Sequence, residues 1–184
     1  GTTAVPFFAL DSLGTGDCAN GFGDSIILYD RLAARWLLSE FSTNGNKMCV
    51  YISQTDDPTG SYYAYAFTAV NGFPDYPKYG VWPDAYYIGT NESISVSTAY
   101  ALDRNSMLTG SPATLQSLTT PTLPGFGFQI IVPSDLDGAL PPPSGSPNYF
   151  MRHRDTEVHG QGSCPTHNNG DCLEIFEFTV DWNT

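Results

Sequence analysis

Hydrophobic residues in this 184-residue chain fall in short β-branched and aromatic runs rather than at helical intervals. Runs of this kind, separated by turn-forming residues, are typical of strands. They occupy residues 25–29, 35–41, 48–53, 61–67, 85–90, 95–102, 128–133, 148–153 and 173–180. Residues 102–110 favour one short turn of helix, and residues 30–41 fit either a helix or a turn followed by a strand. The pattern predicts an all-β chain of antiparallel strands.

These strands recur in a weak internal repeat of about 50 residues, the spacing expected of four-stranded propeller blades. The three units cover about residues 23–70, 73–120 and 126–182. Each contains a short apolar strand, an acidic turn with Asp30, Asp84 or Asp135, and a second strand with aromatic residues. The chain provides about three to four blades, and three blades or slightly more cannot close a ring that typically has about four to eight. We therefore predict one β-propeller-like domain over residues 1–184 that is part of a larger ring, with a β-sandwich as the alternative.

Four segments of the chain carry a resemblance to known proteins. They are residues 23–41, 73–92 ("FPDYPKYGVWPDAYYIGTNE"), 132–150 and 148–159 ("NYFMRHRDTEVH"). They are similar to a propeller-like region of large secreted, often multidomain, bacterial proteins, and the similarity extends from about Gly23 to Trp182. The resemblance implies an extracellular β-propeller module with further blade-like sequence before it. It implies no catalytic residues.

The charge balance limits the possible partners. Nineteen Asp and Glu against seven Lys and Arg give a net charge of −12, and the isoelectric point is near 4.2. Phosphate binding needs a basic surface, so we expect no nucleic-acid partner, whereas divalent cations and neutral substrates remain compatible. No apolar run approaches the length of about 18 residues that spans a membrane. Because the chain begins at Gly1 without Met, we expect a processed protein or a piece of a longer one.

The cysteines, together with a low lysine content, indicate a secreted or extracellular protein. Cys18, Cys49, Cys164 and Cys172 lack the C-x-x-C spacing of zinc and thioredoxin-like sites. Disulfides are therefore favoured over free thiols. Three pairings are possible, of which Cys18–Cys49 with Cys164–Cys172 is the most local.

The densest group of titratable residues is "MRHRDTEVHG", residues 151–160. If this segment begins as a strand, Arg152 and Arg154 share one face, and His153 and Asp155 share the other. Two arginines on one face can bind a carboxylate or sulfate through paired hydrogen bonds. The alternative is structural: each arginine pairs with Asp155, Glu157 or an acidic residue of a neighbouring blade.

A zinc site in the same segment would use His153, Glu157 and His159, with His167 as a fourth ligand. The H-x5-H spacing differs from the helical H-x3-H pair, and the three residues share a face only if the strand continues to residue 159. The glycines that follow indicate that it ends earlier, so the spacing disfavours zinc.

A calcium site is predicted at Asp135 and Asp137. Followed by Gly138, these residues form a D-x-D-G sequence in which two carboxylates can converge on one hard cation. The acidic residue that would complete an EF-hand loop is missing, and a turn stabilised by an Asp side chain explains the sequence equally well.

Aromatic and acidic residues alternate in "DYPKYGVWPDAYY", residues 75–87. Tyr76, Trp82 and Tyr86 can stack on a sugar ring, while Asp75 and Asp84 can accept hydroxyl hydrogen bonds or act as the carboxylates of a glycoside hydrolase. The structural alternative is that prolines make rigid turns here, the Asp side chains cap them, and the aromatic rings fill the core.

Taken together, these features predict an extracellular β-propeller module for binding or assembly, with a glycan or another surface polymer as ligand. One alternative is a glycoside hydrolase of sialidase-like architecture, with Arg152 and Arg154 as the substrate clamp. The other is a structural component whose open edges pair with other chains or with missing blades of the same protein.

Overall fold

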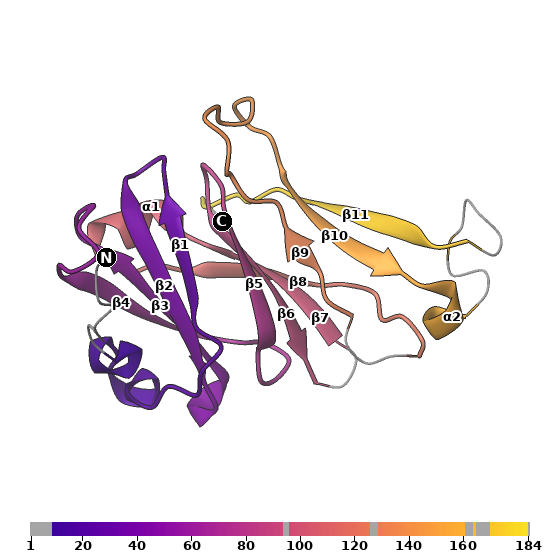
Figure 1. The fold of residues 1–184 in the computed structure, drawn as a ribbon, viewed down its shortest axis with the longest axis horizontal. Helices are drawn as coiled ribbons and strands as arrows, with labels where there is room; N and C mark the ends of the chain where they lie inside the picture. The colour runs from indigo at the N-terminus through magenta and orange to yellow at the C-terminus, as the bar shows by residue number, and fades with distance from the viewer. Residues whose placement is uncertain (1–8, 94–95, 126–128, 161–163, 165–169, 184) are drawn as a thin grey trace, which may run out of the picture. The chain divides into compact units, whose positions relative to one another are not determined.

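A computed structural model describes residues 9–93, 96–125, 129–160, 164 and 170–183. Strands account for 43% of the structure and helices for 13%, so the predicted all-β class is confirmed. Within the described residues the strands form three antiparallel sheets, and in each sheet neighbouring strands are consecutive along the chain (Figure 1).

The first sheet is a four-stranded meander. Its strands are β1 (Ile26–Asp30), β2 (Arg35–Ser42), β3 (Lys47–Ser53) and β4 (Tyr62–Thr68). The short 3-10 helices are η1 (Leu10–Leu13), η2 (Gly16–Ala19) and η3 (Asn44–Asn46). On one face of the sheet, Cys18 packs with Leu38, Cys49 and Tyr51, and a disulfide joins Cys18 to Cys49. The bond fastens η2 to the middle of the sheet.

The second sheet is also a four-stranded meander. Its strands are β5 (Asp75–Val81), β6 (Tyr86–Glu92), β7 (Val96–Leu102) and β8 (Leu115–Thr119). A short helix, α1 (Arg104–Thr109), lies between β7 and β8 in the sequence. Every residue of β6 is buried, including the polar Thr90, Asn91 and Glu92 at its end, which agrees with the consecutive rather than alternating apolar residues at its start.

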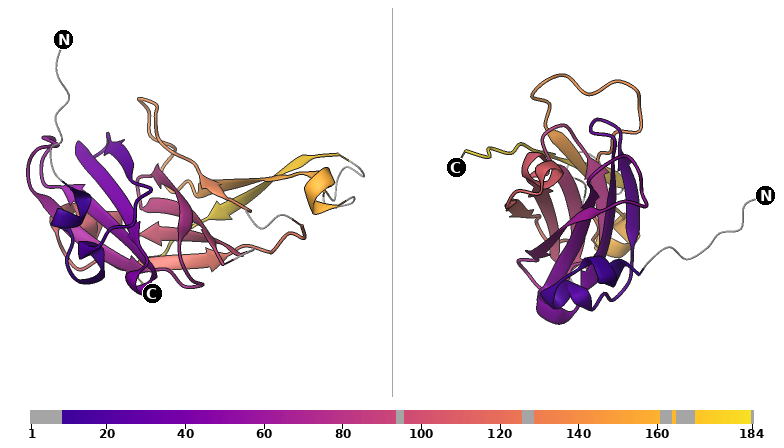
Figure 2. Two further views of the ribbon diagram at one scale, coloured as in Figure 1. Left: turned by 60° about the horizontal axis from the view of Figure 1, so that its bottom comes forward. Right: turned by 90° about the vertical axis from the view of Figure 1, so that its left-hand side faces the viewer.

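The third sheet has three strands in the described residues. They are β9 (Val132–Pro133), β10 (Asn148–Arg154) and β11 (Cys172–Phe178), and the helix α2 (Thr156–His159) follows β10. The long β10–β11 pair and α2 at its end are visible in the left panel of Figure 2. Side chains of β10 alternate strictly between buried and exposed until its last residue, as expected for a strand with one face in the core.

Aromatic and small residues fill the core between the second and third sheets. Tyr87 contacts Phe150 and Phe178, with ring centroids 5.9 and 5.6 Å apart. Gly89 lies against the carbonyl oxygen of Ile131, where a β-carbon would collide with it. Close approach of the two backbones at this point therefore requires glycine.

The chain divides into two compact units. One contains Gly1–Ala69 with Asn105–Ala113, and therefore the first sheet. The other contains Val70–Arg104 with Thr114–Thr184, and therefore the second and third sheets. Each sheet falls within one of the three predicted repeats.

Several local predictions can be compared with the structure. The cysteines form two disulfides, Cys18–Cys49 and Cys164–Cys172, which is the most local of the three possible pairings, and such bonds are typical of oxidising compartments. The helical alternative for residues 30–41 is wrong, because a turn leads into β2. Strand β8 and helix α2 were not expected. Of the helices in the described part of the chain, none has the length and hydrophobicity needed to cross a membrane.

Candidate functional site

Both arginines of the 151–160 segment bind one carboxylate. Arg152 and Arg154 do share a face of β10, and Glu174 lies directly opposite Arg152 on β11. Arg152 Nε donates to Glu174 Oε2 at 2.7 Å, and Arg154 Nη2 lies 2.8 Å from Glu174 Oε1. Burial alone would raise the pKa of the Glu174 carboxyl, but hydrogen bonds from the two guanidinium groups outweigh burial and lower it. The two positive charges are thus already engaged within the third sheet.

Arg152 also links the third sheet to the segment that follows β8. Its side chain is only 2% exposed, and Nη1 donates to the carbonyl oxygen of Pro121 at 2.8 Å. The guanidinium group lies 5.5 Å from the ring centre of Phe176. Such a buried and ion-paired group acts as a structural anchor, and binding of an acidic ligand would require it to leave Glu174.

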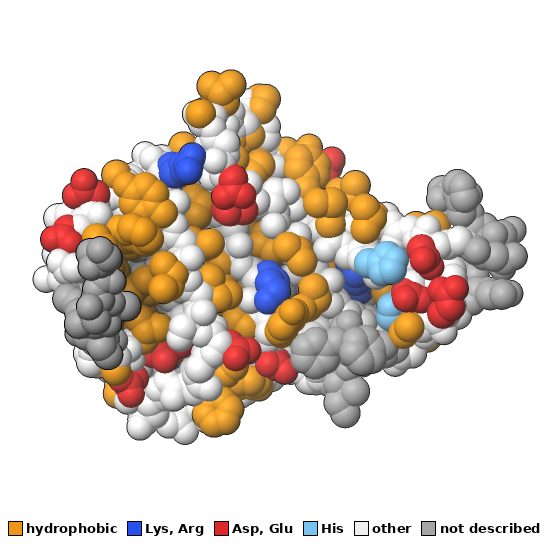
Figure 3. All heavy atoms as spheres, viewed as in Figure 1, with side chains coloured by type: hydrophobic (Ala, Val, Ile, Leu, Met, Phe, Trp, Pro, Cys, Tyr) orange, Lys and Arg blue, Asp and Glu red, His pale blue; other side chains and the backbone are white. Residues whose placement is uncertain are grey.

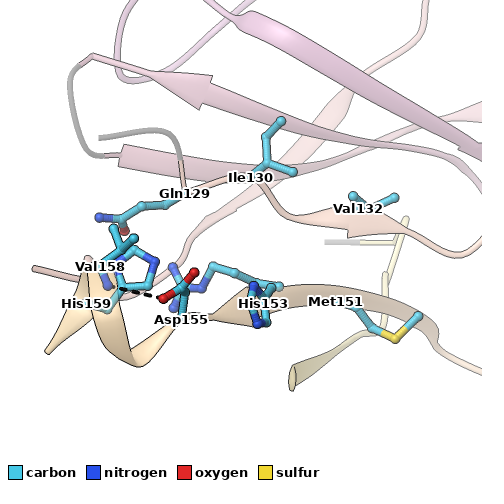
Figure 4. A pocket seen from close by; sticks show the side chains of 9 residues that line it. Gln129, Ile130, Val132, Met151, His153, Asp155, Val158 and His159 are labelled. Atoms are coloured by element: carbon cyan, nitrogen blue, oxygen red, sulfur yellow. Dashed lines mark hydrogen bonds between the residues drawn. The ribbon is translucent and has the colours of Figure 1, made fainter. Parts of the chain in front are cut away.

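A pocket of about 360 Å³ lies where the segment before β9 separates from β10, and we call it the β10 pocket. Its lining residues are Gln129, Ile130, Val132, Met151, Arg152, His153, Asp155, Val158 and His159. Figure 4 shows Gln129, Ile130 and Val132 on one side and the residues of β10 and α2 on the other. Six of the nine come from the segment that the sequence singles out.

The polar side chains of the β10 pocket differ in their exposure and in the hydrogen bonds they already make within the chain. His159 is buried, and its Nδ1 lies 2.8 Å from the carbonyl oxygen of Pro124, so Nδ1 carries the proton and donates it. Asp155 Oδ1 accepts from the backbone N–H groups of Glu157 and Val158 and thereby caps α2. His153 is exposed on the opposite face of β10 from the arginines, as predicted.

Three carboxylates cluster beside this pocket without forming a convincing metal site. Oxygen atoms of Asp155, Glu157 and Asp171 lie within 4.8 Å of one another. Asp155 and Asp171 accept hydrogen bonds from the first N–H groups of α2, which accounts for their position. Figure 3 shows the acidic group next to histidine side chains at this end of the third sheet. The predicted zinc ligands are not brought together: Glu157 belongs to the acidic group without His153 or His159, and His167 lies outside the described residues.

The predicted calcium residues lie in the loop after β9. Asp135 Oδ1 accepts a hydrogen bond of 2.7 Å from the backbone N–H of Val81, which fastens the loop to the end of β5. Asp137 is exposed in the same loop. Neither residue belongs to a group of three metal-ligating side chains in the described part of the chain.

The two predicted catalytic carboxylates lie at opposite ends of β5. Asp75 pairs with Asn91 at one end of the β5–β6 hairpin, and Asp84 lies in the turn at the other end. A strand of this length separates them by roughly 20 Å. The carboxylates of glycoside hydrolases are about 5 to 9.5 Å apart, so these two do not form such a pair. Asp84 Oδ2 instead accepts from the Tyr87 hydroxyl at 3.1 Å, and burial together with this carboxylate raises the pKa of Tyr87.

The aromatic residues of the same segment do not form one surface. Trp82 and Tyr86 are buried, Trp82 Nε1 donates to the Ser146 carbonyl, and Arg104 lies over the Tyr86 ring. Tyr76 alone of the three is exposed, at 45%, and Lys78 Nζ lies 3.5 Å from its ring centre. The structure places Trp82 and Tyr86 in the core, so a stacking platform made of all three rings is not present.

No protein-family model, curated protein or solved structure matches the chain. The site must therefore be interpreted from its own residues. Sequence reasoning missed Glu174, because "LEIFEF" resembles any half-exposed strand until its register with β10 is known. It also missed the apolar wall of the β10 pocket, where Ile130 and Val132 precede the loop that carries the expected calcium residues.

Proposed function

We propose that the chain is an extracellular binding module whose β10 pocket accepts a neutral carbohydrate. The observation that carries this proposal is the composition of the pocket: apolar walls from Ile130, Val132 and Met151 beside the polar groups of His153 and Asp155. A volume of about 360 Å³ lies within the range of small-ligand sites. Sugars present apolar C–H faces and hydroxyl groups that both donate and accept, which suits such a lining.

The ligand is neutral rather than acidic because Arg152 and Arg154 are already engaged with Glu174. An acidic sugar would need Arg152 or Arg154, and both bind Glu174. Moving Arg152 out of the core would break its ion pair with Glu174 and its hydrogen bond to the carbonyl oxygen of Pro121. The engagement of both arginines favours this proposal over the sialidase-like clamp, and so does the separation of Asp75 from Asp84 along β5.

The architecture we infer is that of propeller blades belonging to a larger extracellular protein. Support comes from the strand order, since each sheet is an antiparallel meander of consecutive strands. The spacing of the sheets along the chain matches the repeat of about 50 residues that a blade needs. Two disulfides agree with an oxidising compartment.

Titration with a panel of neutral and acidic saccharides, followed by ligand-observed NMR, tests the proposal. We expect millimolar or tighter binding of at least one neutral sugar. His153→Ala removes one exposed polar group and should weaken that binding about fivefold, whereas Met151→Glu should abolish it by placing a charge on the apolar wall. Tyr149→Ala is the matched control, because Tyr149 lies on the same exposed face of β10 and does not line the pocket.

Three outcomes would contradict the proposal. The first is absence of binding to every neutral sugar. The second is binding of acidic sugars only, which would favour an arginine clamp. The third is equal loss of affinity in His153→Ala and Tyr149→Ala, which would place the sugar elsewhere on this face. Unchanged circular dichroism of the variants excludes misfolding as the cause.

A further inference from the structure

The third sheet has an open edge at β11. The first and second sheets each contain four strands, whereas in the described residues β11 pairs only with β10 (Figure 1). All seven residues of β11 pair with β10 without a shift of register, so the strand is regular over its whole length. No proline or bulge protects it, although these are common devices at sheet edges.

The backbone direction of β11 identifies the groups at this edge. The carbonyl of Tyr149 accepts from Ser134 N–H on the β9 side of β10, so the residues on either side of Tyr149 point their backbone groups toward β11. Because pairing is Phe150↔Phe176 and Arg152↔Glu174, residues 174 and 176 face β10. Leu173, Ile175 and Glu177 therefore direct their N–H and C=O groups away from β10.

The side chains of the same residues extend an exposed apolar surface to the edge. Leu173 is 64% exposed and Ile175 is 61% exposed. Ile175 lies opposite Met151, which lies opposite Val132, so one apolar row crosses all three strands. Hydrophobic side chains gathered over the third sheet are visible in Figure 3.

On the opposite, core-facing side of the third sheet, a groove next to β11 would receive the inward side chains of an added strand. Its volume is about 180 Å³. Its lining is mainly apolar and comes from β7, β8, the segments around β9, β10 and β11: Ala99, Leu118, Thr119, Thr120, Pro121, Ile131, Phe150, Phe176, Glu177 and Phe178. A strand placed beside β11 would thus find apolar contacts on both of its faces.

Charge distinguishes between possible partners. The exposed acids at β11 are Asp171 and Glu177, and residues 155–184 contain no Lys or Arg. Edges that are protected against pairing often carry lysine, and this one carries the opposite charge. A second copy of the chain is disfavoured, because each copy has a net charge of −12 and β11–β11 pairing would bring the same acidic residues together.

We propose that β11 accepts an extended cationic peptide strand of another protein, which completes the third sheet as its fourth strand. Backbone hydrogen bonds to Leu173, Ile175 and Glu177 supply the pairing, and the apolar groove receives alternate side chains of the peptide. Lys or Arg at the ends of the peptide faces the acids of β11. This inference uses a different edge from the β10 pocket and does not depend on sugar binding.

A synthetic peptide tests this inference directly. The probe alternates Val and Thr, matches β11 in length and carries Lys at both ends; the control peptide has Glu in place of Lys. Binding of the fluorescently labelled peptides is measured by anisotropy, and amide hydrogen exchange is followed by NMR. We expect the cationic peptide to bind, with an affinity that falls as salt is added, and the acidic peptide not to bind. The amides of Leu173, Ile175 and Glu177 should gain protection.

Two variants of Ile175 distinguish strand pairing at the β11 edge from nonspecific peptide binding. Ile175→Pro removes an N–H that points to the open edge and leaves the β10–β11 bonds in place, so it should weaken binding about tenfold or more. Ile175→Thr keeps the N–H and the β-branched shape and should bind within about threefold of the original chain. Ile175 does not line the β10 pocket, so failure of this inference would leave the proposed sugar binding unaffected.

Other results would overturn the inference. Equal binding of the cationic and the acidic peptide would show that no strand is added at β11. So would binding of the cationic peptide to Ile175→Pro as tightly as to the original chain. Protection of the three amides before any peptide is present, with a mass of two chains by sedimentation, would show that a second copy covers the edge instead.

Discussion

Glu174 lies directly opposite Arg152 in the β10–β11 ladder, and its carboxylate joins the guanidinium groups of Arg152 and Arg154. The two arginines are two residues apart, so strand alternation puts them on one face, and the acid between them on the next strand reaches both. In a chain with only 14% charged residues, this arrangement concentrates much of the cationic charge in one structural contact. It follows that the group stabilises the third sheet rather than serving as a ready anion site.

Removing the acid should destabilise the protein. Glu174→Gln leaves the buried Arg152 with a neutral partner, and we expect the free energy of unfolding to fall by about 2 kcal/mol, less than for a fully buried pair because Glu174 is partly exposed. Urea denaturation measures the change. The control is Glu177→Gln on the exposed face of the same strand, where a change within about 0.5 kcal/mol is expected. Equal effects of both substitutions would contradict this role of Glu174.

The same contact should depend on pH in a defined direction. The pKa of Glu174 lies below its ordinary value of 4.5 in the folded protein. Its contribution to stability is therefore complete above pH 4.5 and is lost as the pH falls through the lower folded pKa. Urea denaturation of the original chain and of Glu174→Gln over this range should show their difference shrinking toward acid. A difference that grows on acidification would reverse the assigned sign.

Sequence alone predicted the local geometry of β10 and not its partner. The alternation that places Arg152 and Arg154 on one face follows from strand geometry, and it holds because Phe150 and Arg152 both point into the core. The choice of Glu174 as their partner depends on the register of β11, in which Phe150 lies opposite Phe176 and contacts Phe178, both far along the chain.

Residues 75–87, the segment rich in aromatic residues, show a different limit of prediction from sequence. Trp82 and Tyr86 have the composition of a sugar site, and the same residue types fill protein cores. The decision depends on whether another layer covers them, and for Trp82 that information lies in Ile131 and Phe150, tens of residues away. Strand β8 was missed because "LQSLT" contains two leucines and three polar residues, so its pairing with β7 determines its structure more than its own composition.

Glu40 offers a test in the first sheet. It is buried, its Oε1 accepts from the Tyr51 hydroxyl at 3.2 Å, and burial raises its pKa above the ordinary 4.5 despite that hydrogen bond. The folded protein therefore favours the protonated form, and the associated stabilisation is present below pH 4.5 and lost as the pH rises through the folded pKa. Glu40→Gln keeps an acceptor for Tyr51 without the charge.

The substitution Glu40→Gln should raise the free energy of unfolding at pH 7, with a smaller gain below pH 4.5. Denaturation at the two pH values measures both. Glu177→Gln is again the control, since that residue is exposed and should show no such gain. Loss of stability at neutral pH would mean that the charge of Glu40 is needed in the fold.

The two disulfides should contribute unequally. Cys18 and Cys49 are 31 residues apart, and Cys164 and Cys172 are 8 apart. From the chain entropy removed in the unfolded state, replacing the first pair with serine should cost about 4 kcal/mol and replacing the second about 3 kcal/mol. Denaturation of the two double-serine variants under the same conditions compares them. A larger loss from the Cys164–Cys172 variant would indicate that the short bond supports native contacts in the third sheet.

Packing of the second sheet against the third depends on Gly89. A β-carbon at this position would collide with the carbonyl oxygen of Ile131. Gly89 lies within the fully buried strand β6, and the Ile131 backbone is packed tightly against it. Gly89→Ala should therefore lower the free energy of unfolding by about 2 kcal/mol, as overpacked sites commonly do. The control is Gly138→Ala in the exposed loop, where a β-carbon meets nothing within 4 Å and a change within about 0.5 kcal/mol is expected. If Gly89→Ala were as stable as the control, the segment before β9 would have to yield at Ile131, and the shape of the adjoining β10 pocket would change with it.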